Sequence, residues 1–511
     1  MPDPSVLVVG AGPTGLVLAL ALARQGVRCR IIDRSAGPGA ASRAMVVQAR
    51  TLELYAQLGI ADAVVAEGIR MSGVHLRSGT DDVATLDLRD MGAGLSPYPF
   101  VLSYPQDDHE RLLTRHLAAA GIEVEWNTTL QTFASGERDV SATLVRQGAT
   151  ERLRVAWLCG CDGAHSTVRR ALGLDFPGGT YDQAFYVADV ETDHAAEPWL
   201  VGNLGDRGIT LMMPVRSTGM HRLIGTIPEP LLSRNDLTFE DVRATAEQLM
   251  GVRVTGVNWF STYRVHHRVA AHFRRGRAFI AGDAGHIHSP AGGQGMNTGI
   301  GDAVNLAWKL AAVVQGRAPT ALLDTYESER IAFARKLVES TDRAFRALVD
   351  RGRASSVLRT WLMPHVVPAL TGLARVRRTI FNTLSQIRIQ YHDSALSEGE
   401  AGHLRGGDRL PWVPDVVGDD NFASLAPGGW TLHVYGALDP VLRTAAVSEG
   451  VAVAEFDWTG AAERAGVARD AMYLVRPDGY IALAAPAQDA ARLSEYVARH
   501  GLRPAAAPGV A

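Results

Sequence analysis

The chain has 511 residues, 47% of them hydrophobic and 21% charged, a composition that indicates a soluble globular protein of two or three domains. Its formal net charge of −3 offers no positive field, so we expect no nucleic-acid partner. The apolar run at 16–23 is too short to cross a bilayer and follows a glycine loop instead of a basic leader. We therefore expect no signal peptide, no membrane partner and a cytoplasmic location.

The first 33 residues predict a strand, a helix and a second strand. Residues 5–9 are a β-branched run typical of a buried parallel strand, 16–25 predict an apolar helix, and 27–32 predict the second strand. The loop between the first strand and the helix is Gly10-Ala11-Gly12-Pro13-Thr14-Gly15, and Asp33 follows the second strand. In this context Gly-x-Gly-x-x-Gly binds a dinucleotide. The alternative is a chance glycine loop on an ordinary βαβ unit.

The positions of this loop have distinct physical roles. Gly10 permits the tight turn, Gly12 lets a pyrophosphate approach the backbone, and Gly15 lets the helix pack closely on the strand. The N-terminus of the helix offers free N–H groups to the phosphates. We expect Asp33 to accept hydrogen bonds from the ribose hydroxyls of an adenosine.

The rest of the chain changes its periodicity twice. We expect amphipathic helices at 51–67 and 107–120, a strand at 153–161, a short helix at 165–172, antiparallel strands at 185–190, 208–215 and 221–227, a strand from 277, a helix ending near 315, mostly helix over 322–392, and alternating strands and helices from 408. This order predicts an α/β fold, with a Rossmann-like domain at 1–180 and 266–395 (the latter including a helical linker), an antiparallel-sheet domain at 181–265, and a small domain at 396–511.

Three further glycine motifs follow the first. Gly160-Cys161-Asp162-Gly163 opens a second turn into a helix, a strand at 277–281 ends in Gly282-Asp283, and Gly292-Gly293-Gln294-Gly295-Met296-Asn297 begins the long helix. The Gly-Asp position suits a ribityl chain or a phosphate. A helix N-terminus beside a reduced flavin would stabilise its negative charge by up to about 1–2 kcal/mol.

These motifs in this order resemble the class A flavin monooxygenases, the p-hydroxybenzoate hydroxylase superfamily, and most of all its aromatic polyketide hydroxylases and phenol-hydroxylase-like members. The resemblance covers nearly the whole chain. It implies bound FAD, reduced by NAD(P)H as a transient co-substrate, and O2 that forms a flavin C4a-hydroperoxide. That intermediate would hydroxylate a phenolic or polycyclic aromatic substrate without requiring a catalytic side chain. Because there is one Gly-x-Gly-x-x-Gly, NAD(P)H would bind along the surface.

The resemblance also assigns residues to FAD. Asp283 would bind the ribityl end, 295–297 would surround the isoalloxazine, the backbone of Leu130 would contact the adenine end, and Pro290 would line the oxygen-reacting edge. Asp33 is shorter than the family's usual Glu. The full set expected at FAD is Gly10, Gly12, Pro13, Thr14, Gly15, Asp33, Arg34, Arg43, Gln106, Leu130, Asp162, Asp283, Pro290, Gly293, Gly295, Met296 and Asn297.

The substrate is expected between the flavin and the middle sheet, against Met212, Met213, Val215 and Pro290. Benzoate-type members of the family place an Arg on that sheet to pair with a carboxylate, whereas the run here is apolar. Methionines adapt to irregular ligands, which favours a large aromatic substrate over a small anion. The alternative is that these methionines are ordinary sheet core.

Residues 396–511 resemble the thioredoxin-like domain of some family members, with Arg476-Pro477-Asp478-Gly479-Tyr480 matching its last hairpin. No cysteine follows Cys161, so thiol redox chemistry is excluded there, and packing or homodimer contact is the expected role. Cys159 and Cys161 lack a third metal ligand, as do His286 and His288. We therefore expect no metal, structural cysteines, and histidines that hydrogen-bond near the Gly-Asp loop.

Two other functions remain open on the sequence. The same flavin chemistry could insert oxygen into a polycyclic ketone, as in a Baeyer–Villiger reaction. A non-catalytic flavin-binding protein, with the C-terminal domain as an adaptor, is the alternative from another class. A flavin halogenase is disfavoured because the Trp-x-Trp-x-Ile-Pro motif is absent.

Overall fold

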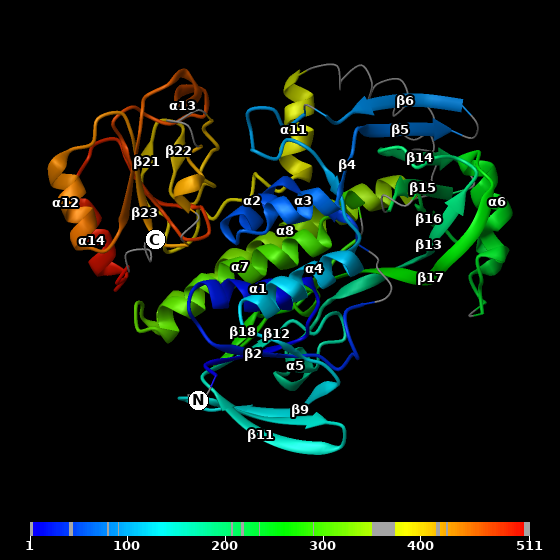
Figure 1. The fold of residues 1–511 in the computed structure, drawn as a ribbon, viewed down its shortest axis with the longest axis horizontal. Coiled ribbons are helices and arrows are strands. Elements are labelled where there is room, and N and C mark those ends of the chain that lie inside the picture. The colour runs from blue at the N-terminus through cyan, green and yellow to red at the C-terminus, as the bar shows by residue number, and fades with distance from the viewer. Residues whose placement is uncertain are drawn as a thin grey trace.

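A computed structural model describes residues 4–39, 44–78, 81–89, 91–205, 208–215, 219–234, 236–289, 291–349, 374–414, 420–425 and 428–504. They form a central domain around a parallel sheet, a domain built on an antiparallel sheet, and a C-terminal α/β domain (Figure 1). This is the fold class that the sequence predicts. Within the described residues, none of the helices combines the length and apolar character needed to cross a membrane.

The central domain is built on a six-stranded sheet in the order β18-β19-β12-β1-β2-β8. Its strands are β1 (Val6–Val9), β2 (Cys29–Ile32), β8 (Val124–Glu125), β12 (Trp157–Gly160), β18 (Arg274–Arg275) and β19 (Ala278–Ile280). All pair in parallel except β18. Helices α1 (Pro13–Arg24), α4 (Gln106–Ala119) and α7 (Gly295–Val314) lie together on one side of this sheet (Figure 1). The strand β1 is apolar throughout because it is buried on both faces.

Smaller elements surround this core. On the other side of the sheet lie α5 (Thr167–Ala171) and a three-stranded antiparallel sheet of β9 (Thr128–Ser135), β10 (Val140–Arg146) and β11 (Ala149–Val155) (Figure 1). A second small sheet contains β3 (Val46–Val47), β7 (Leu102–Ser103) and β4 (Ile69–Arg70), near α2 (Ala49–Gln57) and α3 (Ala61–Glu67).

Two expected elements are each divided in the structure. The helix expected over 51–67 is two helices, because Gly59 between them adopts the left-handed φ of 67°. The strand expected over 153–161 is two strands of different sheets: β11 ends an antiparallel hairpin and β12 enters the parallel sheet. Apolar residues continue across both breaks, which hides them in the sequence.

The antiparallel sheet has eight strands in the order β20-β17-β13-β16-β15-β14-β5-β6. They are β5 (Gly73–Ser78), β6 (Asp81–Asp87), β13 (Gly178–Thr192), β14 (Trp199–Gly205), β15 (Gly208–Pro214), β16 (His221–Thr226), β17 (Val254–Val269) and β20 (His286–Ile287). Helix α6 (Glu240–Met250) packs on one face. Strands β5 and β6, which join this sheet from the first segment of the chain, are not among the elements predicted from the sequence.

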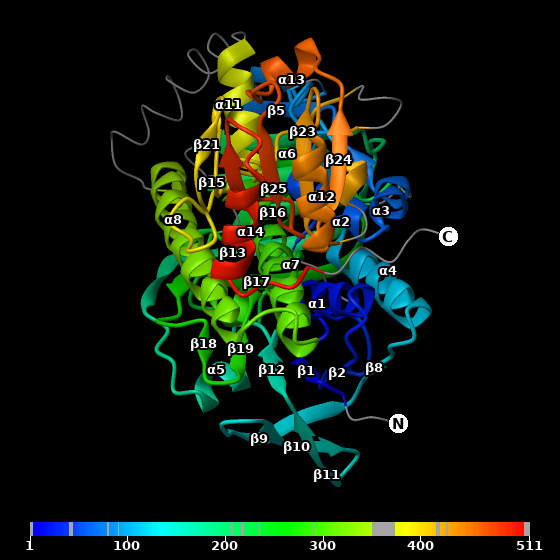
Figure 2. The same cartoon turned by 90° about the vertical axis from the view of Figure 1, so that its left-hand side faces the viewer.

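The C-terminal domain follows two helices, α8 (Asp324–Val349) and α11 (Ala374–Leu384), and a hairpin of β21 (Glu400–Ala401) and β22 (Leu404–Arg405). Its elements are β23 (Thr431–Tyr435), α12 (Pro440–Ser448), β24 (Ala452–Phe456), α13 (Gly460–Arg464), β25 (Met472–Val475), β26 (Ile481–Ala485) and α14 (Ala490–Arg499). The sheet order β24-β23-β25-β26, with only β23 and β24 parallel, is thioredoxin-like. Helices α12 and α14 cover its outer face (Figure 2).

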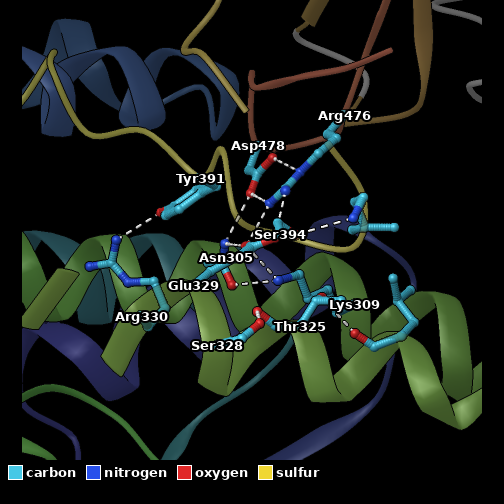
Figure 3. Close-up of polar contacts among 12 residues, drawn as sticks. Asn305, Lys309, Thr325, Ser328, Glu329, Arg330, Tyr391, Ser394, Arg476 and Asp478 are labelled. Atoms are coloured by element: carbon cyan, nitrogen blue, oxygen red, sulfur yellow. Dashed lines mark hydrogen bonds and ion pairs between the residues drawn. The ribbon is translucent and has the colours of Figure 1, made fainter. Parts of the chain in front are cut away.

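The C-terminal domain shares a core with the central domain. Trp308 and Ala312 of α7 pack in one cluster with Trp430 and Leu432 of the C-terminal domain. Beside this cluster, buried Glu329 of α8 accepts hydrogen bonds from Lys309 at 2.7 Å and from Arg476 at 2.7 and 2.9 Å (Figure 3). One carboxylate therefore joins α7, α8 and the turn between β25 and β26.

We expect Glu329→Gln to lower the thermal midpoint of unfolding strongly, because removing one partner of a buried ion pair costs about 3–5 kcal/mol. Glu455→Gln is the control: Glu455 pairs with Arg443 on the exposed surface of the C-terminal domain, where a pair contributes about 0–1 kcal/mol. The measurement is thermal unfolding of both variants beside wild type. Equal midpoints for the two variants would contradict the prediction.

The loss of stability in Glu329→Gln should depend on pH. Burial opposes ionisation of Glu329, but Arg476 and Lys309 outweigh it and hold the pKa of this carboxyl below its ordinary 4.5. The stabilisation by the carboxylate is therefore complete above that pH and is lost as the pH falls below it. The difference in midpoint between wild type and Glu329→Gln should narrow on acidification.

Candidate functional site

The glycine loop after β1 is shaped by contacts between backbones. A Cβ on Gly10, whose φ is 104°, would lie 2.3 Å from the carbonyl oxygen of Cys161. A Cβ on Gly15 would lie 1.9 Å from the carbonyl oxygen of Gly10. At Gly12, by contrast, no atom lies within 4 Å of that position. The loop is thus closely packed at its ends and open at its centre.

The open centre coincides with the N-terminus of α1. Gly12 is the residue before this helix and provides no side-chain cap, and Pro13 is its first residue. The first N–H groups of the helix therefore remain for a ligand, and an anion approaching Gly12 would meet them. This arrangement fits the pyrophosphate of a dinucleotide.

Asp33 lies beside the loop at the end of β2. Its carboxylate accepts hydrogen bonds from the backbone N–H of Ala11 and of Ser35, both at 2.7 Å, which orients it toward the loop. Exposed Arg34 is adjacent, and Thr128 at the start of β9 donates its N–H to the carbonyl of Asp33 at 2.8 Å. Leu130 is buried two residues further along β9. Asp33, Arg34 and β9 therefore meet at the end where an adenosine is expected.

The Asp-Gly motif lies directly behind Gly10. One oxygen of Asp162 accepts hydrogen bonds from the N–H groups of Thr167 at 2.6 Å and Val168 at 3.2 Å, so it caps α5. The other oxygen is buried and has no hydrogen-bond partner among the described residues. Asp162 thus links the glycine loop to α5 and retains one unused acceptor.

The Gly-Asp motif meets both helices at Thr14. A Cβ on Gly282 would lie 2.6 Å from the hydroxyl oxygen of Thr14, and a Cβ on Gly299 would lie 2.3 Å from it. Thr14 therefore fits between the Gly-Asp turn and α7 only because both neighbours are glycines. Asp283, on the short 3-10 helix Gly282–Ala284, has an exposed side chain.

The loop before α7 contains two left-handed glycines, Gly292 with φ 78° and Gly293 with φ 62°. A Cβ on Gly293 would lie 2.8 Å from the Cβ of Val46 in β3. The helix N-terminus at Gly295 has no side-chain cap, as at α1, and Met296 is half-buried beside it. Its N–H groups remain for a ligand.

The side chain of Asn297 is engaged with the protein. It donates to the carbonyls of Val46 and Gly293, both at 2.8 Å, and accepts from the N–H of Gln48 at 2.9 Å and the hydroxyl of Thr51 at 2.8 Å. These four contacts use its hydrogen-bonding capacity. Asn297 ties α7 to α2, which leaves its backbone to face a ligand.

Three residues expected at FAD remain: Gln106, Arg43 and Pro290. Gln106, at the first residue of α4, donates its side-chain amide to Glu110 at 2.8 Å and its backbone N–H to the carbonyl of Ala44 at 3.0 Å. Arg43 and Pro290 lie outside the described residues.

The three substrate candidates at the end of β15, Met212, Met213 and Val215, are divided between the two faces of the antiparallel sheet. Met213 and Val215 form a buried cluster with Met45 and Met71, against which Val46 packs. Since Val46 also contacts the Gly293 position, this face of the sheet adjoins the loop before α7. Met212 points the other way, into the core under α6. The structure therefore brings Met213 and Val215 to the same side as the glycine loops but not Met212.

The face of the sheet that carries Met213 is not apolar throughout. Arg222 pairs with Met213 across β15 and β16, and Asp189 pairs with Arg222 across β13 and β16, so all three lie on one face. The Arg222 guanidinium donates to both oxygens of Asp189 at 2.7 Å, and Arg222 is fully buried. The available signal for this pair was a charged residue beside apolar neighbours in each strand, Asp189 after Val187 and Ala188 and Arg222 before Leu223 and Ile224.

His286 and the two cysteines near the loops are buried, and His288 is half-buried. The ring of His286 hydrogen-bonds through Nε2 to Asp302 at 2.7 Å, and His288 hydrogen-bonds through Nδ1 to the carbonyl of Ser289 at 2.8 Å. Burial lowers the pKa of His288 to about 4 and raises that of the thiols of Cys159 and Cys161. In the part of the chain that the structure describes, no three His, Cys, Asp or Glu gather as metal ligands.

Residues 3–341 match the family model described as "FAD binding domain". The chain belongs to this family of flavoproteins. The family resemblance stated from the motifs is therefore confirmed, and FAD is the cofactor that the glycine loop, Asp33 and the two helix N-termini fit.

Related proteins define the kind of flavoprotein. The chain is 36% identical to 6-methylpretetramide 4-monooxygenase of Streptomyces rimosus over 94% of this chain and 90% of the relative. It is similar in structure to aklavinone-11 hydroxylase, solved with FAD and aklavinone (TM-score 0.80, 27% identity, 98% and 100% of the chains). It is also similar to the flavin-dependent monooxygenase PieE, solved with FAD and substrate (TM-score 0.82, 26% identity, 98% and 99% of the chains). The protein is an FAD-dependent aromatic monooxygenase, and a non-catalytic flavin protein is set aside.

We expect Gly12→Ala to keep the fold and bind FAD more weakly, whereas Gly10→Ala should lose the fold. Gly12 has φ −74° and open space around it, so alanine is compatible with the chain but occupies the room for the pyrophosphate. We expect FAD affinity to fall about tenfold or more, which is a loss of about 1.4 kcal/mol. The measurements are bound cofactor, run against FAD and FMN standards, and circular dichroism. FMN in the wild type, or full FAD in Gly12→Ala, would contradict this site.

Proposed function

We propose that the enzyme hydroxylates a phenolic or polycyclic aromatic substrate of polyketide type, using NAD(P)H and O2. The observation that carries this proposal is the broad wall on the flavin-facing side of the eight-stranded sheet. Half-buried Leu211 and Ile224 pair across β15 and β16 there, next to the row that contains Met213. Such a wall suits the flat face of a ring system.

The buried ion pair on this wall supports a substrate of low charge. Because both oxygens of Asp189 face the Arg222 guanidinium, the charge of Arg222 is already balanced. A small anionic substrate would have to compete with Asp189 for that guanidinium. The relatives support the same class of substrate, since one is named for 6-methylpretetramide and another is solved with aklavinone.

Bound FAD supplies the transfer of electrons from NAD(P)H and the activation of O2. The residues proposed to hold it are the glycine loop with Pro13 and Thr14 at the pyrophosphate, Asp33 and Arg34 at the ribose, Leu130 at the adenine end, and Gln106, Asp162, Asp283, Gly293, Gly295, Met296 and Asn297 toward the flavin. The two uncapped helix N-termini, at α1 and α7, stabilise negative charge on the phosphates and on the reduced ring.

The protein contributes orientation and the exclusion of water. Met213 and Val215, in their buried methionine cluster, would place the aromatic ring beside the loop before α7 and keep solvent away from the reacting edge. NAD(P)H would reduce the flavin in a transient encounter, since the sequence holds one Gly-x-Gly-x-x-Gly.

The direct test supplies labelled oxygen gas together with a panel of phenolic polycycles. We expect an accepted substrate to accelerate NAD(P)H oxidation and to gain one oxygen atom from O2, as shown by mass analysis of the product. Product oxygen from water, or NAD(P)H oxidation indifferent to every aromatic tested, would contradict hydroxylation. A ring-expanded ester would instead assign the Baeyer–Villiger reaction.

Two variants compare the importance for turnover of the loop before α7 with that of the antiparallel sheet. Gly293→Val needs a left-handed φ of 62° and displaces Val46, so we expect turnover to fall more than about tenfold through loss of the loop's freedom to move. Met213→Leu conserves volume in the same region and should cost less than about 1.5 kcal/mol in stability, with turnover near wild type. The measurement is substrate-dependent NAD(P)H oxidation in both variants. Greater loss in Met213→Leu would contradict the role of the loop.

A further inference from the structure

The turn between β25 and β26, residues 476–480, is buried against α7 and α8 (Figure 3). Besides the two bonds to Glu329, the guanidinium of Arg476 donates to the carboxylate of Asp478 at 2.6 and 3.0 Å. Asn305 of α7 also donates to Asp478, at 3.3 Å. Charged contacts on three elements therefore hold this turn of the C-terminal domain in one position.

The turn also contacts the segment that precedes the C-terminal domain. The rings of Tyr480 and Tyr391 lie 4.3 Å apart between centroids, and both side chains are buried. The guanidinium of Arg476 lies 5.3 Å from the centre of the Tyr391 ring and 5.6 Å from that of Tyr480. Packing from the C-terminal domain thus fixes the place of the Tyr391 ring.

From Tyr391, hydrogen bonds continue to the Gly-Asp turn. Arg330 of α8 donates to the Tyr391 hydroxyl at 2.8 Å and to Asp302 of α7 at 2.6 Å (the first bond is drawn in Figure 3). The other oxygen of Asp302 accepts the backbone N–H of Gly282 at 3.0 Å. The sequence Tyr480, Tyr391, Arg330, Asp302, Gly282 is one continuous path through buried groups.

Arg330, Asp302 and Gly282 on this path depend on one another for partners. Arg330 and Asp302 are essentially inaccessible, so each needs the other's charge. Burial raises and Arg330 lowers the pKa of Asp302, with Arg330 and His286 prevailing, so the carboxyl is ionised. Gly282 adopts a left-handed φ of 62°, and its N–H bond to Asp302 holds that conformation. A displaced Arg330 would therefore loosen the turn and leave Asp302 less neutralised.

We propose that Tyr391 and Tyr480 are positioning residues through which the cysteine-free C-terminal domain fixes the Gly282–Asp283 turn, and with it the affinity and the reduction potential of FAD. The inference rests on the proposed contact between this turn and FAD. In this role the C-terminal domain influences the flavin site without a thiol.

The test uses two variants that each delete one buried tyrosine hydroxyl. Tyr391→Phe removes the acceptor of Arg330, whereas the control Tyr435→Phe removes an acceptor of Asn421 inside the C-terminal domain, away from the path. We expect Tyr391→Phe to raise the Kd of FAD about tenfold, because Arg330 without its acceptor can shift away from Asp302 and loosen the turn proposed to contact FAD. Its midpoint potential should become more negative, because the poorly neutralised Asp302 opposes the charge of reduced flavin. Tyr435→Phe should match wild type in both quantities.

Titration of the cofactor-free full chain with FAD, and redox titration of the reloaded enzyme, provide these readouts. Tyr480→Leu, which removes the supporting ring, should shift both quantities in the same direction as Tyr391→Phe. Wild-type values in Tyr391→Phe, or equal shifts in Tyr435→Phe, overturn the inference. Asp283→Ala tests the contact of the turn with FAD separately from the positioning role of the tyrosines. If Asp283→Ala weakens FAD binding and Tyr391→Phe does not, the flavin contact stands and the positioning role is wrong. If neither Asp283→Ala nor Tyr391→Phe weakens binding, the contact with the turn is wrong as well.

Discussion

The flavin site depends on the close approach of backbone segments at glycines. Gly10 and Gly15 bring the first loop against itself and against the end of β12, and Thr14 fits between Gly282 and Gly299. A Cβ at any of these four glycines would lie within 2.6 Å of another atom. The first loop, the end of β12, the Gly-Asp turn and α7 therefore converge at one point, and the loop stays open at Gly12 between its closely packed ends.

Buried charge holds the layers around this point together. Glu329 joins α7, α8 and the C-terminal domain, while Asp302 and Arg330 join α7, α8 and the Gly-Asp turn. Such pairs are not a source of large net stability, because each ion loses its hydration on burial. Their effect is to make displaced arrangements costly, since moving one partner leaves the other unpaired. The helices α1 and α7, whose uncapped N-termini are proposed to face the flavin, are thereby kept in register.

The two faces of the antiparallel sheet lie in different surroundings, because side chains alternate between them along each strand. Met212 and Leu223 lie in the core under α6, whereas Met213 and Arg222 lie on the face that adjoins the loop before α7. A strand presents successive side chains to opposite faces, so adjacent methionines have unrelated surroundings. The Arg222–Asp189 ion pair gives the face that carries Met213 a buried polar position.

The sequence by itself determined the α/β fold class and the presence of a dinucleotide site, and its resemblance to the flavin monooxygenases indicated FAD and a thioredoxin-like C-terminal domain. The fold class and the dinucleotide site rest on local patterns: a glycine loop between strand and helix, and periodicities of two and of 3.6 residues. Only the tertiary structure decided that β5 and β6 join the antiparallel sheet and that the side chain of Asn297 hydrogen-bonds to the start of α2. It also decided that Arg222 pairs with Asp189, and that Tyr480 packs on Tyr391, from which hydrogen bonds continue to Gly282. Each of these pairs residues far apart in the chain, and the partner of a polar group or of a strand edge is chosen by packing across the whole molecule, which no local pattern encodes.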